Sequence, residues 1–179
     1  MKRIAWMLGA VSLVLVSFGE TAVADFVEWE YELTADGRHA TICKRGEGAK
    51  PLSGDIAIPS SLAGYSVTGI GEDAFAKCKE VTSVMFAPGL TQIGRWAFQD
   101  CDELKSVTFP ASLAYMGNEV FADCTRLTKV TFQGPPPTWV VLGLRKLGKD
   151  VAIEYDESHK EQWLPVLVKI GRAQPTGQP

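Results

Sequence analysis

The sequence of 179 residues contains no cluster of lysine and arginine, and its formal net charge is −3. Binding to nucleic-acid phosphates needs clustered basic side chains, so the sequence argues against a nucleic-acid partner. Anionic membrane surfaces are disfavoured for the same reason. The charged fraction of 22% and the apolar fraction of 46% are ordinary for folded domains, and they argue against wholesale disorder.

Residues that commonly carry catalysis or bind metals are also scarce. The two histidines, His39 and His159, lie far apart in the sequence. The chain has no Cys-x-x-Cys pair and no glycine-rich phosphate loop. The segment from Gly64 to Thr68 approaches a nucleophile elbow, but Thr68 replaces the closing glycine. We therefore expect no enzyme activity, no catalytic or metal-binding residues and no cofactor.

Long hydrophobic runs are absent except at the start of the chain. Lys2 and Arg3 precede an apolar stretch over residues 4–18, and small residues follow at positions 22 and 24. This order predicts a secretory signal over residues 1–24. The stretch is shorter than the roughly 20 residues that span a bilayer, so we expect no membrane insertion after signal removal. The predicted location is outside the cytoplasmic membrane: secreted, periplasmic or on the cell surface.

A repeat of 23 residues fills the middle of the chain. The segment from Ile70 to Cys78 recurs as Ile93 to Cys101 and again as Met116 to Cys124. Further columns keep the same spacing: Val81, Leu104 and Leu127; Val84, Val107 and Val130; Phe86, Phe109 and Phe132. No unit of 23 residues can bury its own apolar side chains, so the repeat predicts a solenoid of stacked units.

Each unit is expected to combine two extended segments with a helical turn. The alternation of apolar and polar residues from Val107 to Phe109 predicts a short strand, which ends at Pro110. The pattern Leu-x-x-Ile-Gly predicts a second extended segment, with Gly94 at the bend that leaves it. The following residues, such as 95–101, are expected to make one or two helical turns. We expect the phenylalanines of these turns to stack as a buried spine: Phe75, Phe98 and Phe121.

The motif Cys-x-x-Leu-x-x-Val-x-Phe-Pro, followed by Leu-x-x-Ile-Gly-x-x-Ala-Phe, resembles the BspA-like leucine-rich repeat family over about Leu52 to Gln133. The chain departs from the commonest leucine-rich consensus because its cysteine lies before the strand. The resemblance implies an α/β solenoid, a right-handed stack of short parallel strands and short helical turns. It also implies a secreted or surface-displayed protein, similar to members that look like adhesins.

The two ends of the array are expected to cover its core, as a solenoid requires. We divide the chain into a signal peptide (1–24), an N-terminal β-hairpin cap (25–50), leucine-rich repeats (51–133), a C-terminal strand-helix cap (134–171) and a flexible tail (172–179).

Local motifs predict details of these ends. The hairpin is expected to turn over residues 35–38, and an insertion in the first repeat is expected to protrude at Gly64-Tyr65. The prolines at 135–137 are expected to stop the regular repeat. A capping box over residues 158–161 predicts a helix that Pro165 kinks or ends early.

The cysteines allow two interpretations. Cys78, Cys101 and Cys124 share one column of the repeat, and Cys43 lies in the predicted hairpin. They can serve as small buried side chains that fill the core. Alternatively, two neighbours in the column, or Cys43 and Cys78, form a disulfide in an exported protein. The sequence leaves both interpretations open, together with the oligomeric state.

The outward positions of the Val-x-Phe strands predict a partner-binding surface. These positions are Ser83, Met85, Ser106, Thr108, Lys129 and Thr131. Trp96 takes a turn position that is acidic in the other units, where it either anchors a partner or packs onto a neighbouring unit. We hypothesise a protein that mediates protein–protein interaction or adhesion through these residues. The alternative is a passive spacer in which the repeats matter only for shape.

Overall fold

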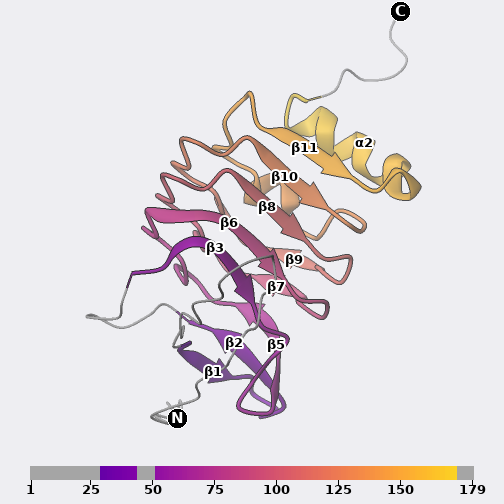
Figure 1. The fold of residues 1–179 in the computed structure, drawn as a ribbon. Helices are drawn as coiled ribbons and strands as arrows, with labels where there is room; N and C mark the ends of the chain where they lie inside the picture. Colours follow the sequence, from indigo (N-terminus) through magenta and orange to yellow (C-terminus); the bar gives the residue numbers. More distant parts are fainter. Residues whose placement is uncertain (1–28, 44–50, 173–179) are drawn as a thin grey trace, which may run out of the picture.

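The computed structural model describes residues 29–43 and 51–172, and the chain winds through them as a stack of coils (Figure 1). The strands are β1 (Tyr31–Leu33), β2 (His39–Ile42), β3 (Ser53–Ile58), β4 (Ser61–Leu62), β5 (Tyr65–Ile70), β6 (Glu80–Phe86), β7 (Gln92–Ile93), β8 (Ser106–Phe109), β9 (Tyr115–Met116), β10 (Lys129–Phe132) and β11 (Ala152–Tyr155). The helices are α1 (Val140–Gly143), the 3-10 helix η1 (Glu157–His159) and α2 (Lys160–Lys169). Three parts of the chain lie outside the described residues. They are the predicted signal peptide, residues 25–28 and 44–50 of the predicted hairpin cap, and residues 173–179 of the predicted tail.

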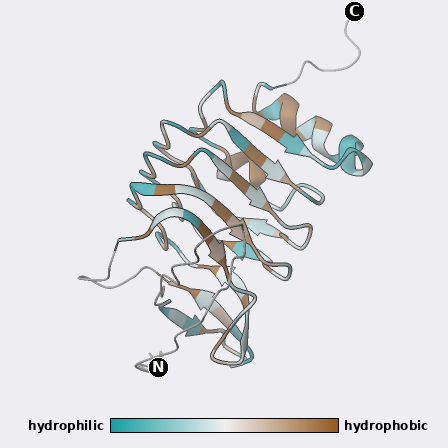
Figure 2. Ribbon diagram, viewed as in Figure 1, coloured by the Kyte–Doolittle hydropathy of each residue, from teal (hydrophilic) through white to brown (hydrophobic). Residues whose placement is uncertain are grey.

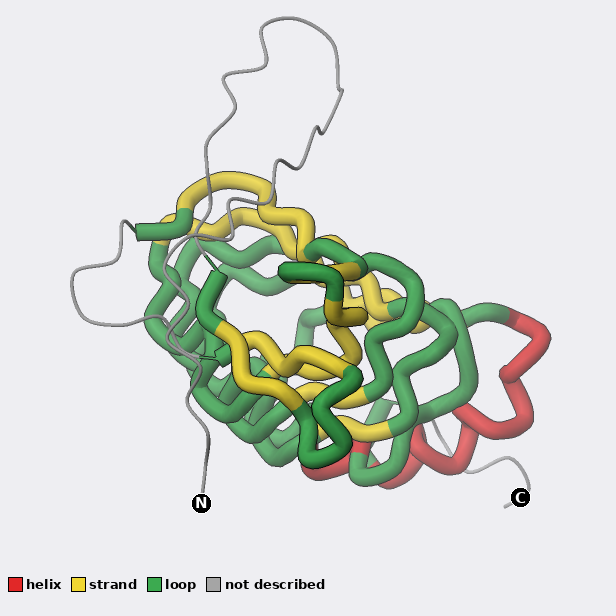
Figure 3. The backbone as a smooth tube through the Cα atoms, turned by 90° about the horizontal axis from the view of Figure 1, so that it is seen from below, coloured by secondary structure: helices red, strands yellow, loops and turns green. Residues whose placement is uncertain are grey.

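The coils build two sheets on opposite sides of the stack. One sheet has five strands in the order β11-β10-β8-β6-β3, and all of its pairs are parallel. The other follows the order β1-β2-β5-β7-β9, with β4 paired to β5. Viewed along the stack in Figure 3, loops join the strands of the two sides. Val84, Val107 and Val130 pair across neighbouring strands, so the predicted solenoid with a period of 23 residues is confirmed.

Two columns of aromatic rings run through the core. Phe98 stacks between Phe75 and Phe121, with ring centroids 5.0 Å and 5.9 Å apart. All three side chains are buried, so the predicted spine is confirmed. In the second column, the ring centroids of Phe109 and Phe132 lie 5.2 Å apart. Trp163 of α2 is the last ring of this column, and its centroid lies 4.6 Å from that of Phe132. Figure 2 shows the matching alternation of hydrophobic and hydrophilic residues along β8 and β10.

The predicted helical turns are hydrogen-bonded turns without a helix. In the turn over residues 95–101, the Phe98 amide donates to the Val120 carbonyl of the next coil at 3.0 Å. The Asp100 amide likewise donates to the Ala122 carbonyl at 2.9 Å. Because these amides bond between coils, they are not available for the bonds four residues back that an α-helix needs. The prediction of helical turns was therefore wrong, and the turns themselves join the coils.

The N-terminal hairpin joins the second sheet. β1 pairs with β2 in antiparallel fashion, and β2 pairs with β5 in parallel. The Thr34 amide donates to the His39 carbonyl at 2.9 Å, so residues 35–38 form the turn between the two strands, as expected. Trp29 is buried, and its ring packs edge-on against Phe75 at 6.0 Å. The first ring of the spine is thereby covered.

The insertion in the first repeat is a tight hairpin between β4 and β5. Leu62 pairs with Tyr65, which leaves Ala63 and Gly64 as the two turn residues. Their φ values of 48° and 85° are those of the turns that best join twisted antiparallel strands. The tip therefore lies at Ala63-Gly64, one residue before the expected position, because Tyr65 belongs to the strand.

The proline run changes the sequence pattern without ending the stack. Thr138 forms a parallel bridge to Tyr115, which lies 23 residues earlier. β11 continues the first sheet in register, with Ala152 paired to Lys129. The turns of the preceding coils contain residues in the left-handed conformation, and Lys146 repeats this conformation with a φ of 65°. A further coil therefore follows the prolines that were expected to stop the regular repeat.

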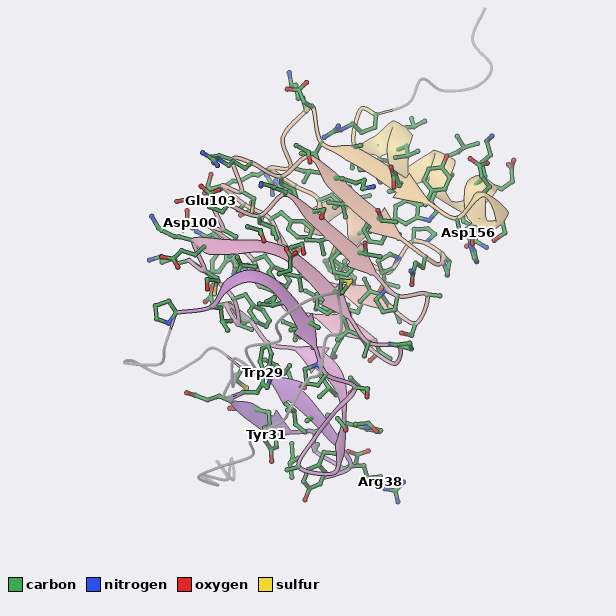
Figure 4. All side chains as sticks on the ribbon, in the orientation of Figure 1. Trp29, Tyr31, Arg38, Asp100, Glu103 and Asp156 are labelled. Carbon is green, nitrogen blue, oxygen red and sulfur yellow. The ribbon has the colours of Figure 1, made fainter. Side chains whose placement is uncertain are left out.

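α2 lies beyond β11 at the C-terminal end of the stack (Figure 1). The Asp156 carboxylate accepts hydrogen bonds from the hydroxyl and then from the amide of Ser158, which hold its pKa below the usual carboxyl range. The predicted capping box does not form, because Asp156, labelled in Figure 4, caps η1 instead. Pro165 lies inside α2 and does not end it early. Burial of Trp163 and Leu167 offsets the cost of an internal proline, which is about 3 kcal/mol.

Candidate functional site

The strand register brings six of the seven predicted binding residues onto one surface. We call the outward side chains of the five-stranded sheet the strand face. One row across the strands contains Asp55, Ser83, Ser106, Lys129 and Ala152. The second row contains Ala57, Met85, Thr108, Thr131 and Glu154. The alternation of the strands turns these side chains away from the buried valines and phenylalanines.

At the β3 end of the strand face, the polar groups satisfy one another. The Asp55 carboxylate accepts hydrogen bonds from the Thr82 hydroxyl at 2.6 Å and from the Ser83 hydroxyl at 2.7 Å. These two bonds, that of Thr82 first, lower the pKa of Asp55. The carboxylate is thus charged and already bonded at neutral pH, which makes this end a weak candidate for contacting a partner.

The β11 end of the strand face is paired in a similar way. The Lys129 ammonium lies 3.3 Å from the Glu154 carboxylate, which also accepts a hydrogen bond from the Thr131 hydroxyl at 3.3 Å. The ion pair is solvent-exposed, so it contributes at most about 1 kcal/mol to stability. Like the β3 end, this end presents polar groups that already have partners in the protein.

The centre of the strand face differs from both ends. Met85 is 49% exposed, which is unusual for a large apolar side chain. Thr108 lies beside it in the same row, and Ser106 lies on the same strand as Thr108. Within the described part of the chain, neither the Ser106 nor the Thr108 hydroxyl has a hydrogen-bond partner in the protein. The centre therefore combines an accessible apolar group with hydroxyls that can bond to another molecule.

Trp96 lies apart from the strand face. It occupies a turn with a φ of 54°, and its indole Nε1 donates to the Glu119 carboxylate of the next coil at 3.2 Å. The Arg95 guanidinium covers the ring at 3.4 Å from its centroid. The cations of Arg145 and Lys146 lie 4.0 Å and 3.6 Å from Glu119. Of the two interpretations of Trp96, the geometry matches packing onto a neighbouring unit.

The indole bond to Glu119 predicts a measurable effect of Trp96→Phe. The substitution keeps an aromatic ring but removes the only donor of the indole, so we expect it to lower the free energy of unfolding by about 1–2 kcal/mol. Urea denaturation at pH 7 measures this loss. Trp139→Phe is the matched control, because Trp139 is 60% exposed and its indole bonds to no described residue. Equal stability of the two variants would show that the bond contributes nothing.

Two exposed aromatic residues were missed by the sequence analysis. Tyr115 of β9 is 43% exposed, and Trp139 follows Thr138, the residue that bridges to Tyr115. Tyr115 corresponds to Gln92 in the preceding coil, as their pairing shows. A comparison of this outward column, in addition to that of the Val-x-Phe strands, would have revealed Tyr115. No sequence pattern pointed to Trp139, because the proline run hides the fact that the repeat register continues beyond it.

The cysteine column lies along the edge of the core. The Cys101 thiol donates to the Phe75 carbonyl at 3.2 Å, and the Cys124 thiol donates to the Phe98 carbonyl at 2.9 Å. Cys101 is buried, whereas Cys78 and Cys124 are partly buried against the core. A hydrogen bond to Cys124 and burial raise the pKa of Cys101, so its thiol is neutral at physiological pH. Among residues 29–43 and 51–172, no disulfide joins the cysteines.

Other kinds of site were sought among residues 29–43 and 51–172. No group of three or more His, Cys, Asp or Glu side chains is placed to hold a metal ion there. His39 lies in β2 and His159 in η1, near opposite ends of the stack (Figure 1). In the same ranges, no helix is both long enough and apolar enough to cross a membrane.

The geometry agrees with comparisons to known proteins. The family described as the BspA type leucine rich repeat region matches residues 55–137 in six copies. This segment is a BspA-type leucine-rich repeat region. It starts in β3 and ends within the proline run, so the family suggested by the cysteine, valine and phenylalanine columns is confirmed. No curated protein matches the chain significantly.

The chain is also similar to three solved structures of leucine-rich proteins. A leucine-rich repeat protein from Bacteroides capillosus ATCC 29799 is 27% identical, with a TM-score of 0.56 over 72% of this chain and 94% of that one. A leucine-rich repeat protein of T. pallidum is 21% identical, with a TM-score of 0.43 over 73% and 63%. A leucine-rich cell surface protein from Faecalibacterium prausnitzii A2-165 is 19% identical, with a TM-score of 0.42 over 75% and 40%.

Proposed function

We propose that this BspA-type repeat protein is exported and binds a protein partner through the centre of the strand face. The observation that supports the proposal is the group formed by Met85, Ser106 and Thr108. An exposed methionine can adapt to different partner surfaces, and adjacent free hydroxyls can add directed hydrogen bonds. The sheet surfaces of solenoids commonly serve as binding surfaces. Export is supported by the secretory signal that residues 1–24 predict.

The dimensions of the strand face set the expected affinity. Five strands spaced by about 4.8 Å span roughly 20 Å, and each presents about 13 Å of its length. The face alone therefore offers a few hundred Å², whereas a stable interface needs about 800 Å² per partner. A partner has to contact neighbouring loops as well, and we expect dissociation constants near the micromolar range. Weak binding of this kind suits adhesion by many copies on one surface.

A pair of charge substitutions tests the proposal. We expect at least one of a panel of purified extracellular-matrix proteins to bind the wild-type chain in surface plasmon resonance. Thr108→Glu should weaken that binding by roughly tenfold or more, because it places a charge without a partner at the centre of the contact. Thr125→Glu is the control, since it adds the same charge to an exposed turn on another side of the coil.

The outcomes separate the proposed function from a passive spacer. Loss of binding in Thr108→Glu together with unchanged binding in Thr125→Glu supports the strand face. Equal affinities of both variants would exclude the strand face as the contact surface. If no protein of the panel binds the wild-type chain, the spacer interpretation is favoured, because a spacer needs only the shape of the stack.

A further inference from the structure

We propose that a pocket at the C-terminal end of the stack binds a small amphiphilic anion, in which a carboxylate or phosphate is attached to a hydrocarbon chain. The pocket has a volume of about 660 Å³ and lies between the segment over residues 141–149 and the end of α2. Volumes from about 300 to 1,000 Å³ are typical of small-molecule sites. The pocket is separate from the strand face, so the two proposals stand or fall independently.

All of the charged side chains that line the pocket are basic. They are Arg145, Lys146, Lys149, Lys169 and Arg172. This concentration stands out because the whole chain has a net charge of −3. The sequence shows no such cluster, since the first three residues and the last two are about 20 positions apart. The fold brings them together by laying the end of α2 against the last coil.

The positive charge of the pocket is only partly neutralised within the described residues. Arg145 and Lys146 share a single carboxylate, that of Glu119. The Arg172 guanidinium donates to the carbonyls of Gly148, Lys149 and Val151, which fixes its position but leaves its charge unbalanced. The ammonium groups of Lys149 and Lys169 have no carboxylate partner among the residues that the structure describes.

Clustered charges of one sign repel each other, so an anion in the pocket lowers the electrostatic energy. The carbonyl groups at the end of α2 contribute a partial negative charge that opposes an anion. Lys169 and Arg172 lie at the same helix end, and their two full charges exceed the roughly half charge of the helix dipole. The net field in the pocket therefore favours a negatively charged ligand.

The remaining lining is apolar, and this decides the kind of anion. The apolar residues in the lining include Val141, Leu144, Leu147 and Ile170. Leu144 is buried, while the other three are partly buried and pack against the core. An inorganic anion would contact the basic groups and leave these apolar surfaces in water. A hydrocarbon chain attached to the anion covers them, so the lining fits an amphiphile better than a free ion.

Calorimetric titration of the full chain with four probes tests the charge and the apolar part separately. We expect octyl phosphate and octanoate to bind. Octyl glucoside shares the chain but lacks the charge, and inorganic phosphate has the charge but lacks the chain. Both should bind at least tenfold more weakly than octyl phosphate. Equal affinity for octyl phosphate and either of these two probes would overturn the proposal. Preference between octyl phosphate and octanoate identifies the anionic group.

Substitutions and amide chemical shifts locate the binding. The double variant Lys149→Met, Lys169→Met should bind octyl phosphate at least tenfold more weakly. The control Lys77→Met, Lys105→Met removes the same charge from exposed positions elsewhere and should bind as the wild type does. In the wild-type chain, octyl phosphate should shift the amide signals of residues 141–149 and 169–172, and this effect should weaken as salt is raised. Unchanged affinity of the first variant, or shifts confined to other residues, would refute the pocket.

Discussion

Phe98→Ala is expected to lower the free energy of unfolding by roughly 3–5 kcal/mol. Phe98 is fully buried, and its ring contacts Phe75 on one side and Phe121 on the other. Phe86 of the second aromatic column also packs edge-on against it at 6.0 Å. Alanine leaves a cavity between three coils, and backbone hydrogen bonds between those coils prevent them from closing it. Urea denaturation followed by circular dichroism measures the loss.

The matched control for Phe98→Ala is Tyr115→Ala. It removes a ring of similar size from a side chain that is 43% exposed, so we expect a loss of less than about 1 kcal/mol. A loss in Phe98→Ala as small as that of the control would mean that the spine does not stabilise the stack. Such a result would contradict the central feature of the fold, because three successive coils each place one phenylalanine in this column.

Gly94→Ala is expected to destabilise the protein by about 3 kcal/mol, although it adds only a methyl group. A Cβ atom at Gly94 would lie 2.5 Å from the backbone nitrogen of Glu72 and 2.5 Å from the carbonyl carbon of Gly71. These atoms belong to the preceding coil, whose distance is set by the hydrogen bond from the Gly94 amide to the Ile70 carbonyl at 2.8 Å. The coils have to separate, which weakens their hydrogen bonds and aromatic contacts.

Gly148→Ala provides the control for Gly94→Ala. Its Cβ atom would lie 3.4 Å from the Val151 side chain, which is an ordinary contact. Both substitutions reduce the conformational entropy of the unfolded chain to a similar extent, so their difference reports on the folded state. Thermal denaturation should show a lower Tm for Gly94→Ala than for Gly148→Ala. Equal Tm values would show that the coils can move apart at little cost.

Gly94 also shows how a sequence pattern can place a residue without giving the reason for it. The sequence pattern placed the glycine at the bend that leaves the second extended segment. The structure shows that the backbone of the preceding coil leaves no room for a side chain. Close approach of this kind depends on how tightly the coils stack, and the spacing between two coils is not visible in either one.

The strand face was predictable because the 23-residue repeat shows which residues of successive coils are equivalent. Ser83, Ser106 and Lys129 hold equivalent positions, and equal coils have to stack with equivalent residues side by side. Which of these residues are free to bind was not predictable. The partners of Ser83 and Lys129 come from Asp55 and Glu154, which lie in the first and last strands of the sheet, where the repeat pattern is weakest.

The sequence by itself determined the solenoid, the period of its coils, the buried aromatic spine and the residues of the outward face. It could do so because a periodic pattern of apolar side chains is buried in only one way, by stacking equal units in register. Only the tertiary structure decided the partner of Trp96, the continuation of the stack past the prolines and the basic pocket beside α2. The pocket depends on contacts between segments that share no repeat, and the proline run hides the register in which the stack continues. Trp96 and Glu119 hold equivalent positions in successive coils, but a repeat pattern does not specify which side chains bond to each other.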